Sequence, residues 1–182
     1  NNKNKHKELL KIFQEAGSKH TLKVNNDIPD VIEDKNTIEE NAKKKAEECY
    51  EYFKSPVISD DSGLFVDALD GQPGVHSKRY AVLSSTDVEN NQKLINELKI
   101  ADNLSAFFKT VLCYFDGLNF ITSEGVLNGN IIFEPRGKNG FGYDPIFEVS
   151  GRTLAEMTLD EKSNISHRKL AAVKLVEKLN EI

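Results

Sequence analysis

Two adjacent carboxylates, Asp60 and Asp61, stand in the stretch SDDSGLFVDALDGQPG, directly before Ser62 and Gly63. Consecutive residues on a strand point to opposite faces, so only one carboxylate faces a given site unless the backbone turns, as Gly63 would allow. Adjacent like charges raise each other's pKa unless a cation or hydrogen-bond donors compensate them. Mg²⁺ is a natural compensator, because it prefers carboxylate oxygens. Taken alone, the DDSG stretch fits a turn or helix-cap aspartate at least as well.

Glu40 is the second candidate for a metal site. It stands three residues after Thr37, which is the spacing of a capping box, and a helix cap explains it equally well. Two lysines, Lys44 and Lys45, lie about one turn further along the same expected helix. A lysine run of this kind is ordinarily a solvated helix face, so the sequence leaves both readings of this segment open.

The loop RGKNGFGYDP, residues 136–145, holds three glycines, which let a backbone approach a ligand closely and expose its amide donors. Phe141 and Tyr143 add flat apolar faces on which a nucleic-acid base could stack, and Asp144 adds an acceptor. The pattern is not one of the glycine-rich phosphate loops. Taken alone, a plain hairpin connection explains the loop as well.

Three basic residues, Lys162, His167 and Arg168, cluster in the stretch EKSNISHRKL around a helix start that Ser166 can cap. Basic residues in the first turn of a helix oppose its dipole, so local stability does not explain them, whereas an anionic ligand would. Together, the carboxylates, the glycine-rich loop and this basic cluster are what a nucleoside triphosphate site requires.

Four helices are expected to position these groups, over residues 4–17, residues 38–54, residues 86–99 and from about Ser166 onward. Thr37 and Thr86 are the expected caps of the second and third helices. The residues expected to face the core are Leu9, Leu10, Phe13 and Ala16 in the first helix, Val88, Ile95 and Leu98 in the third, and Leu170, Val173, Val176 and Leu179 in the last.

Strand candidates fall between these helices. HTLKV alternates like a strand, and PVIS and LFVDAL read as two short strands around the aspartate pair. Residues 104–133 read as three strands separated by turns at Asp116-Gly117 and Glu124-Gly125. The mixture of helices and strands favours an α/β or α+β domain with a mixed sheet.

Composition bounds the class of protein. The 182 residues are 38% hydrophobic, which suffices for one sizeable domain or two small lobes. A net charge of −5 gives no support for a surface that binds nucleic acid, although a pocket in an acidic protein can be locally positive. Cys49 and Cys113 are too few for a zinc site or a disulfide framework and are expected to be reduced core residues. With no apolar run long enough to span a membrane and no visible signal peptide, a cytoplasmic protein is expected.

Five sequence blocks together resemble the inosine triphosphate pyrophosphatases, the ITPase family of nonstandard purine NTP pyrophosphatases. SDDSGLFVDALDGQPGVHSKRYA is similar to the family's central motif, and NNKNK resembles the tail of its N-terminal phosphate-binding motif. The other similar blocks are TIEENAKKKA, GFGYDPIF and AEMTLDEKSNISHR. The resemblance covers essentially all 182 residues in the family's order.

The resemblance implies a single ITPase-like domain over residues 1–182, with an α/β fold whose two lobes and flanking helices surround a long mixed central β-sheet and whose active site lies in the cleft. It implies a cytoplasmic homodimer and Mg²⁺-dependent hydrolysis of ITP, dITP or XTP to the monophosphate and pyrophosphate. Such an enzyme clears deaminated purine nucleotides from the NTP pool. The implied partner is a purine nucleoside triphosphate, with no stable nucleic-acid or membrane partner.

The resemblance also implies a role for individual residues. The family's catalytic aspartate falls on Asp61, which would bind the metal and act as general base, with Glu40 as the other metal ligand and Asp60 in support. The phosphate-contacting positions fall on Asn2, Lys5, Lys45 and Ser62. The nucleotide- and base-recognition positions fall on Phe141, Gly142, Tyr143, Asp144, Lys162, His167 and Arg168. The role of Arg79 stays open.

Departures from the family pattern are few. His76 stands where the family often has Tyr, with no expected effect on the chemistry. Because a helix is expected within three residues of Asn1, a first strand and the leading Ser/Thr of the phosphate motif are expected to precede it. Two alternatives stay open: a related pyrophosphatase that prefers pyrimidine or modified nucleotides, and a nucleotide-binding protein without turnover. The paired carboxylates argue against the second, because binding phosphates alone does not call for carboxylates beside them.

Overall fold

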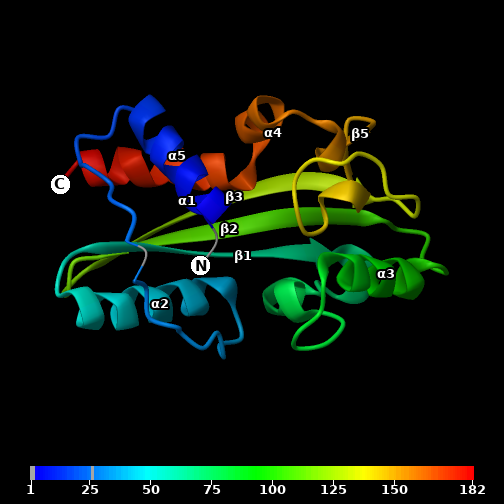
Figure 1. Cartoon of the computed structure of the whole chain (residues 1–182), viewed down its shortest axis with the longest axis horizontal. Helices are drawn as coiled ribbons and strands as arrows, with labels where there is room; N and C mark the ends of the chain where they lie inside the picture. Colours follow the sequence, from blue (N-terminus) through cyan, green and yellow to red (C-terminus); the bar gives the residue numbers. More distant parts are fainter. Residues whose placement is uncertain (1–2, 26) are drawn as a thin grey trace. The chain divides into compact units, whose positions relative to one another are not determined.

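The computed structural model describes residues 3–25 and 27–182, with the side chains of residues 3–5, 7 and 8 outside that description. Its helices are α1 (Lys3–Glu15), α2 (Ile38–Phe53), α3 (Asp87–Leu98), α4 (Leu159–Ile165) and α5 (His167–Asn180) (Figure 1). Its strands are β1 (Val57–Val66), β2 (Ser105–Phe115), β3 (Phe120–Ile131), β4 (Phe147–Val149) and β5 (Arg152–Thr153). Short 3₁₀ helices span Asp67–Leu69, Gly74–Arg79, Asp144–Ile146 and Leu154–Glu156. The expected α/β class is confirmed.

The strands form one sheet in the order β1-β2-β3-β4-β5. The β3–β4 and β4–β5 pairs are antiparallel, with Asn130 opposite Glu148 and Glu148 opposite Thr153. A four-residue connection at the predicted Asp116-Gly117 turn joins β2 to β3, and Asp116 Oδ1 accepts hydrogen bonds from the backbone N–H groups of Leu118 and Asn119. Strands adjacent in sequence are therefore adjacent in the sheet.

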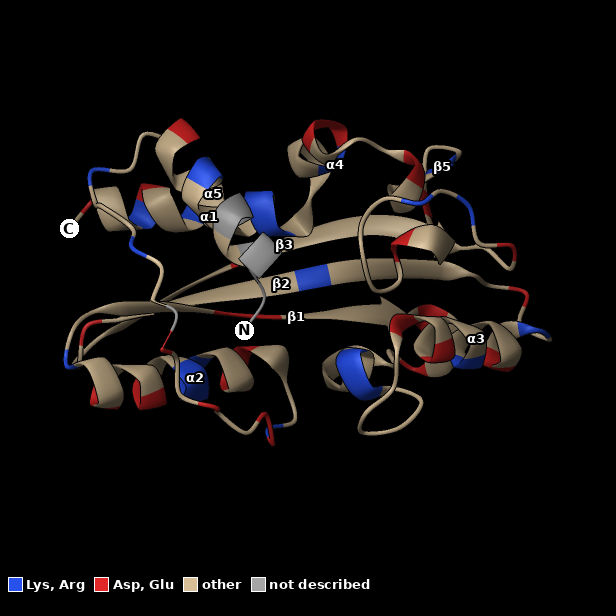
Figure 2. Ribbon diagram, in the orientation of Figure 1, with Lys and Arg blue, Asp and Glu red and all other residues tan. Residues whose placement is uncertain are grey.

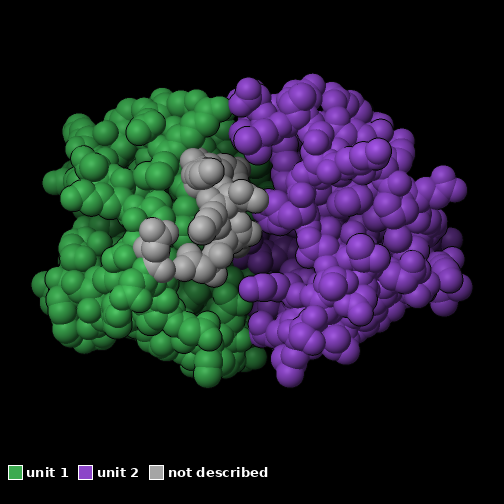
Figure 3. Space-filling model, in the orientation of Figure 1, with its two compact units in different colours: residues 1–61, 110–126, 166–182 green, residues 62–109, 127–165 purple. Residues whose placement is uncertain are grey.

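The chain divides into two compact units, each drawn in its own colour in Figure 3. Unit 1 comprises residues 1–61, 110–126 and 166–182, and unit 2 comprises residues 62–109 and 127–165. Each unit has its own hydrophobic core. The expected active-site cleft between two lobes stays a prediction.

In unit 1, α1 and α5 pack together on one face of the strands, and α2 lies on the other (Figure 1). The core on the α5 side contains Leu9, Phe13, Leu112, Leu175 and Val176, and Ile58 of β1 packs against it. On the α2 side, the hydroxyl of Ser59 donates to the backbone oxygen of Ala42. Because side chains alternate along a strand, both faces of β1 contribute to the packing of this unit.

In unit 2, α3 and the segments around the 3₁₀ helices cover one apolar cluster. The fully buried members of that cluster include Leu64, Leu94, Leu98, Ile146 and Phe147. Thr86 caps α3 in a complete capping box with Glu89, as Thr37 does for α2 with Glu40, so both predicted caps are confirmed. Ser166 also caps α5, and its hydroxyl accepts from the backbone N–H of Lys169 at 3.0 Å.

Two strand predictions are wrong, one near the N-terminus and one around the aspartate pair. HTLKV forms no strand, and β1 runs unbroken from Val57 to Val66 instead of turning at Gly63. Gly63 instead allows the backbone of Gly74 to approach β1 closely, because a Cβ atom at position 63 would overlap the backbone oxygen of Gly74. A glycine between two apolar segments can therefore signal close backbone approach as well as a turn.

The predicted turn at Glu124-Gly125 is also wrong, because both residues lie inside β3 and residues 104–133 form two strands, not three. A Cβ atom at Gly125 would overlap the backbone oxygen of His167, so the glycine lets the start of α5 lie directly against β3. Two residues predicted to face the core are exposed, Val88 at 76% and Leu170 at 44%. Both lie in the first turn of their helix, and at α5 the contact is made by the smaller Ala171 and Ala172.

Both cysteines are free thiols, Cys113 fully buried and Cys49 half-buried. Burial raises the pKa of the Cys113 thiol to about 12. The expectation of a reduced core residue therefore holds for Cys113, whereas Cys49 lies at the edge of the core. No helix in the described part of the chain is long and apolar enough to cross a membrane.

Candidate active site

The aspartate pair on β1 faces two different helices of unit 1. The Asp61 carboxylate is 2.9 Å from Nζ of Lys45 on α2, and the Asp60 carboxylate is 3.9 Å from Nε of Arg168 on α5. Figure 2 shows the acidic segment of β1 and the basic residues of both helices. The predicted divergence of two consecutive strand side chains is confirmed, and each carboxylate has its own cation.

Lys45 lies between two carboxylates. Its Nζ is 2.9 Å from Oδ1 of Asp61 and 2.9 Å from Oε1 of Glu33, and its side chain is 17% exposed. Burial lowers the pKa of the Lys45 ammonium, but the carboxylates of Asp61, Asp60 and Glu33 outweigh that effect and hold the pKa above its usual value. The lysine is therefore charged and directed at the predicted catalytic aspartate, and is no part of a solvated face. Nothing in the stretch around Glu33 pointed to its contact with Lys45, which spans 12 residues.

Glu40 completes the capping box of α2. Its carboxylate accepts from the backbone N–H of Thr37 at 3.1 Å and from the Thr37 hydroxyl at 3.0 Å, and the residue is exposed. The cap explanation is thus confirmed, while the metal-ligand role of Glu40 stays a prediction.

The donor chemistry of this region fits Mg²⁺. Within residues 3–25 and 27–182, no three His, Cys, Asp or Glu side chains are grouped as a metal centre would require. Mg²⁺ does not need such a group, because one or two carboxylates together with substrate phosphates and water usually hold it. Asp61, a buried carboxylate with hard oxygen donors, is suited to this kind of site.

The start of α5 is buried instead of opening to solvent. Ser166, His167 and Arg168 are 2%, 7% and 4% exposed. The buried guanidinium of Arg168 is paired with Asp60, which supplies a physical reason for a basic residue in the first turn of this helix. Of the three basic residues predicted to cluster here, Lys162 lies on α4 in unit 2, where it forms an ion pair with Asp144.

The glycine-rich loop of unit 2 presents one aromatic ring. Phe141 is 39% exposed, and Nζ of Lys162 lies 4.7 Å from the centre of its ring. Tyr143 is 5% exposed, and its hydroxyl donates to the backbone oxygen of Ser77 at 2.7 Å, so its ring belongs to the core of the unit. Of the two aromatic faces predicted for base stacking, Phe141 is therefore the exposed one.

The residues of the sequence analysis not yet placed are Asn2, Lys5, Ser62 and Arg79. Asn2 lies outside the described residues, and Lys5 lies in α1 with its side chain outside the description. Ser62 is half-buried on β1, and Arg79 is half-buried at the end of the Gly74–Arg79 3₁₀ helix. The roles predicted for Asn2, Lys5 and Ser62 stay predictions, and the role of Arg79 stays open.

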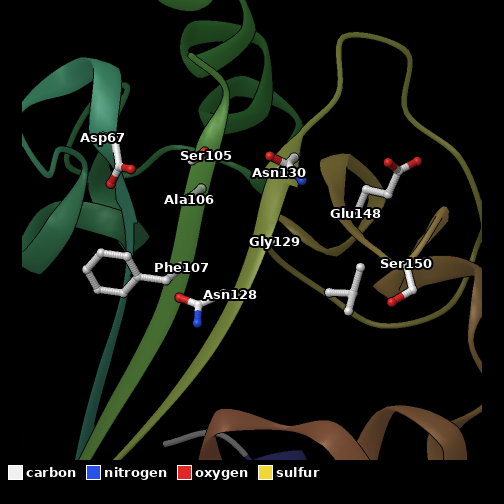
Figure 4. Close-up of a pocket in the computed structure, with 10 residues that line it drawn as sticks. Asp67, Ser105, Ala106, Phe107, Asn128, Gly129, Asn130, Glu148 and Ser150 are labelled. Atoms are coloured by element: carbon white, nitrogen blue, oxygen red, sulfur yellow. The ribbon is translucent and has the colours of Figure 1, made fainter.

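A cavity of about 470 Å³ in unit 2 lies apart from the predicted site residues, none of which lines it (Figure 4). It is lined by Asp67, Ser105, Ala106, Phe107, Asn128, Gly129, Asn130, Glu148, Val149 and Ser150. The Glu148 carboxylate is paired with the Arg136 guanidinium. The lining is mainly polar and provides no cation toward a phosphate, so the cavity gives no reason to move the nucleotide site there.

Comparisons with known proteins agree with the resemblance seen in the sequence. The sequence model of the Ham1 family matches residues 1–178. A dITP/XTP pyrophosphatase of Caldanaerobacter subterraneus is 45% identical over 97% of this chain and 91% of that protein, and one of Streptococcus pneumoniae is 43% identical over 97% and 92%. The solved structure of a HAM1 protein from Coxiella burnetii has a TM-score of 0.89 at 39% identity and covers 100% of this chain and 95% of that one. The Ham1 protein of Staphylococcus aureus has a TM-score of 0.88 at 36% identity, with the same coverage.

Proposed function

The chain belongs to the Ham1 family, and we propose that it is a Mg²⁺-dependent nucleoside triphosphate pyrophosphatase that hydrolyses ITP, dITP and XTP to the monophosphate and pyrophosphate. The observation that carries the proposal is the largely buried ion pair of Asp61, the proposed general base, and Lys45, the proposed phosphate-binding cation. The relatives named dITP/XTP pyrophosphatase, which match nearly the whole chain, support the substrate class.

Asp61 is the proposed general base. A carboxylate in reach of the attacking water accepts its proton as the water oxygen bonds to the α-phosphorus and the α–β phosphoanhydride bond breaks to release pyrophosphate. General-base catalysis of this kind is commonly worth about 10²- to 10⁴-fold in rate. Lys45 would offset the negative charge that develops on the phosphate oxygens in the transition state. Mg²⁺, held by Asp61 and Glu40, would supply Lewis-acid activation of the phosphate oxygens and the water when bound.

Base selectivity would come from groups that pair with the 6-carbonyl of hypoxanthine or xanthine. The proposed donors are His167 and Arg168, with Phe141 stacking on the base. Adenine carries an amine at the 6-position, which cannot accept hydrogen bonds from these donors, and a buried polar group that loses its hydrogen bond costs about 1–3 kcal/mol. Rejection of guanine, which shares the 6-carbonyl, would depend on its 2-amino group.

We further propose that the enzyme is a cytoplasmic homodimer. The two free thiols support a reducing compartment. The homodimer rests on the family resemblance alone, and sedimentation at micromolar concentration would test it.

A substrate panel tests the proposed function. Pyrophosphate release should be fast with ITP, dITP and XTP and at least about tenfold slower with ATP and dTTP, and EDTA should abolish it until Mg²⁺ is restored in excess. Turnover of dTTP or UTP well above that of ITP would instead favour a pyrimidine-directed enzyme. Tight nucleotide binding with no pyrophosphate release would indicate a binding protein.

A further inference from the structure

Two side chains of helix α3 form hydrogen bonds with the glycine-rich loop of unit 2, one to the backbone N–H and one to the backbone oxygen of Gly142. The backbone N–H of Gly142 donates to Oδ2 of Asp87 at 2.6 Å, and Nδ2 of Asn91 donates to the backbone oxygen of Gly142 at 3.1 Å. Asp87 and Asn91 are four residues apart and so share one face of the helix. The two side chains together form what we call the Gly142 clamp.

Gly142 is a position where the backbone needs such support. Its φ is +64°, and the φ of Gly140, on the other side of Phe141 in the sequence, is +80°. Two glycines, which have few intrinsic backbone restraints, therefore flank Phe141. Glycine loses more conformational freedom on ordering than any other residue, and external hydrogen bonds must offset that loss. One bond of the clamp goes to an ionised carboxylate, which is the stronger kind.

The backbone N–H of Phe141 itself is also hydrogen-bonded. The backbone N–H of Phe141 donates to Oδ2 of Asp144 at 2.8 Å, and the ammonium of Lys162 pairs with the same carboxylate. Phe141 is nevertheless 39% exposed, although the peptide units around it are hydrogen-bonded. An apolar ring held at the surface by a bonded backbone is suited to stack on a flat ligand, because little freedom is left to lose on binding.

We propose that Asp87 and Asn91 are positioning residues that orient Phe141 as the stacking surface for the purine base. This proposal deepens the proposed function and depends on it for the identity of the ligand. The clamp acts on binding of the base and leaves the chemistry at the phosphates unchanged. Its loss therefore raises KM for the nucleotide without lowering kcat.

A tryptophan reporter tests the clamp without any turnover. The chain contains no tryptophan, so Phe141→Trp would be the sole source of indole emission. In this background Asp87→Ala should lower the fluorescence anisotropy of the indole and weaken its quenching by IMP, while Asp87→Asn, which keeps an acceptor oxygen, should resemble the parent. Thr86→Ala is the matched control, because it removes the cap of the same helix and keeps both clamp side chains. Equal anisotropy in Asp87→Ala and Thr86→Ala would overturn the proposal.

Kinetics in the native Phe141 background complete the test. Asp87→Ala should raise KM for ITP about tenfold, which is the order expected for losing a hydrogen bond to a charged group, with kcat within about twofold of the native value. Asp87→Asn and Thr86→Ala should stay close to the native KM. A fall in kcat at unchanged KM would contradict the positioning role. Failure of the native enzyme to release pyrophosphate from ITP would refute the proposed function, while the indole anisotropy would still decide on the clamp.

Discussion

Nζ of Lys45 lies 2.9 Å from Oδ1 of Asp61, and both side chains are largely buried, at 17% and 10% exposure. The pair joins the middle of α2 to the middle of β1, and Oε1 of Glu33 is also 2.9 Å from the same ammonium. In this arrangement, the proposed base and the proposed phosphate-binding cation hold each other before any substrate arrives.

Replacing Lys45 with Met should destabilise the protein strongly. The change leaves the buried Asp61 carboxylate without its nearest cation, and we expect a loss of about 2 kcal/mol or more in the free energy of unfolding, measured with urea. Lys43→Met on the same helix is the control. The Lys43–Glu39 pair has exposures of 40% and 50%, and its loss should cost less than about 0.5 kcal/mol. Equal losses in the two variants would mean that the Lys45 pair contributes no more than a surface pair.

Replacing Gly125 with Ala should displace the start of α5. The added methyl group would overlap the backbone oxygen of His167, and overpacking of this kind typically costs about 1–3 kcal/mol. Because His167 and Arg168 begin that helix, KM for ITP should rise as well. Glu124→Ala, at the exposed neighbour on the same strand, is the control for stability and KM. An unchanged urea midpoint and KM in Gly125→Ala would show that α5 can shift at no cost.

The Glu161 carboxylate should make stability depend on pH in acid. The hydrogen bonds from Arg152 and from the backbone N–H of Thr158 lower its pKa to about 2, from 4.5 in an unfolded chain. A lowered folded-state pKa means that the stabilisation is fully present above pH 4.5 and is lost as the pH falls from 4.5 toward 2. Glu161→Gln should therefore lose less stability than the native protein between pH 6 and pH 3, and high salt should shrink the difference, because the group is exposed. Parallel pH profiles at low salt would refute this assignment.

Local signals in the sequence predict α1, α2, α3 and α5 and the caps of the last three, whereas α4 is not among the expected helices. Thr37 with Glu40 and Thr86 with Glu89 form capping boxes that depend on residues three apart, and nothing distant in the chain is needed to form them. The divergence of Asp60 and Asp61 was predictable for the same reason, because alternation is a property of the strand itself.

Contacts between distant segments could not be predicted in this way. The turn predicted at Gly125 is wrong, because a glycine fits a turn and a close helix approach equally well, and only the packing of α5 decides between them. The contact of Asp87 with Gly142 spans 55 residues, and neither residue type is unusual in its local setting. The sequence alone therefore does not predict the contacts of Glu33, Asp87 and Asn91, because these contacts form only when separate segments fold against one another.

The rate of pyrophosphate release from ITP by Asp61→Asn tests the central claim most directly. With saturating Mg²⁺, and with folding confirmed by circular dichroism, the account predicts a fall in kcat of about 10²- to 10⁴-fold. The matched control Asp67→Asn, at an exposed aspartate of unit 2, should retain the native rate. A folded Asp61→Asn protein with kcat within about threefold of the native value would contradict the account, because the reaction would then proceed without the proposed base.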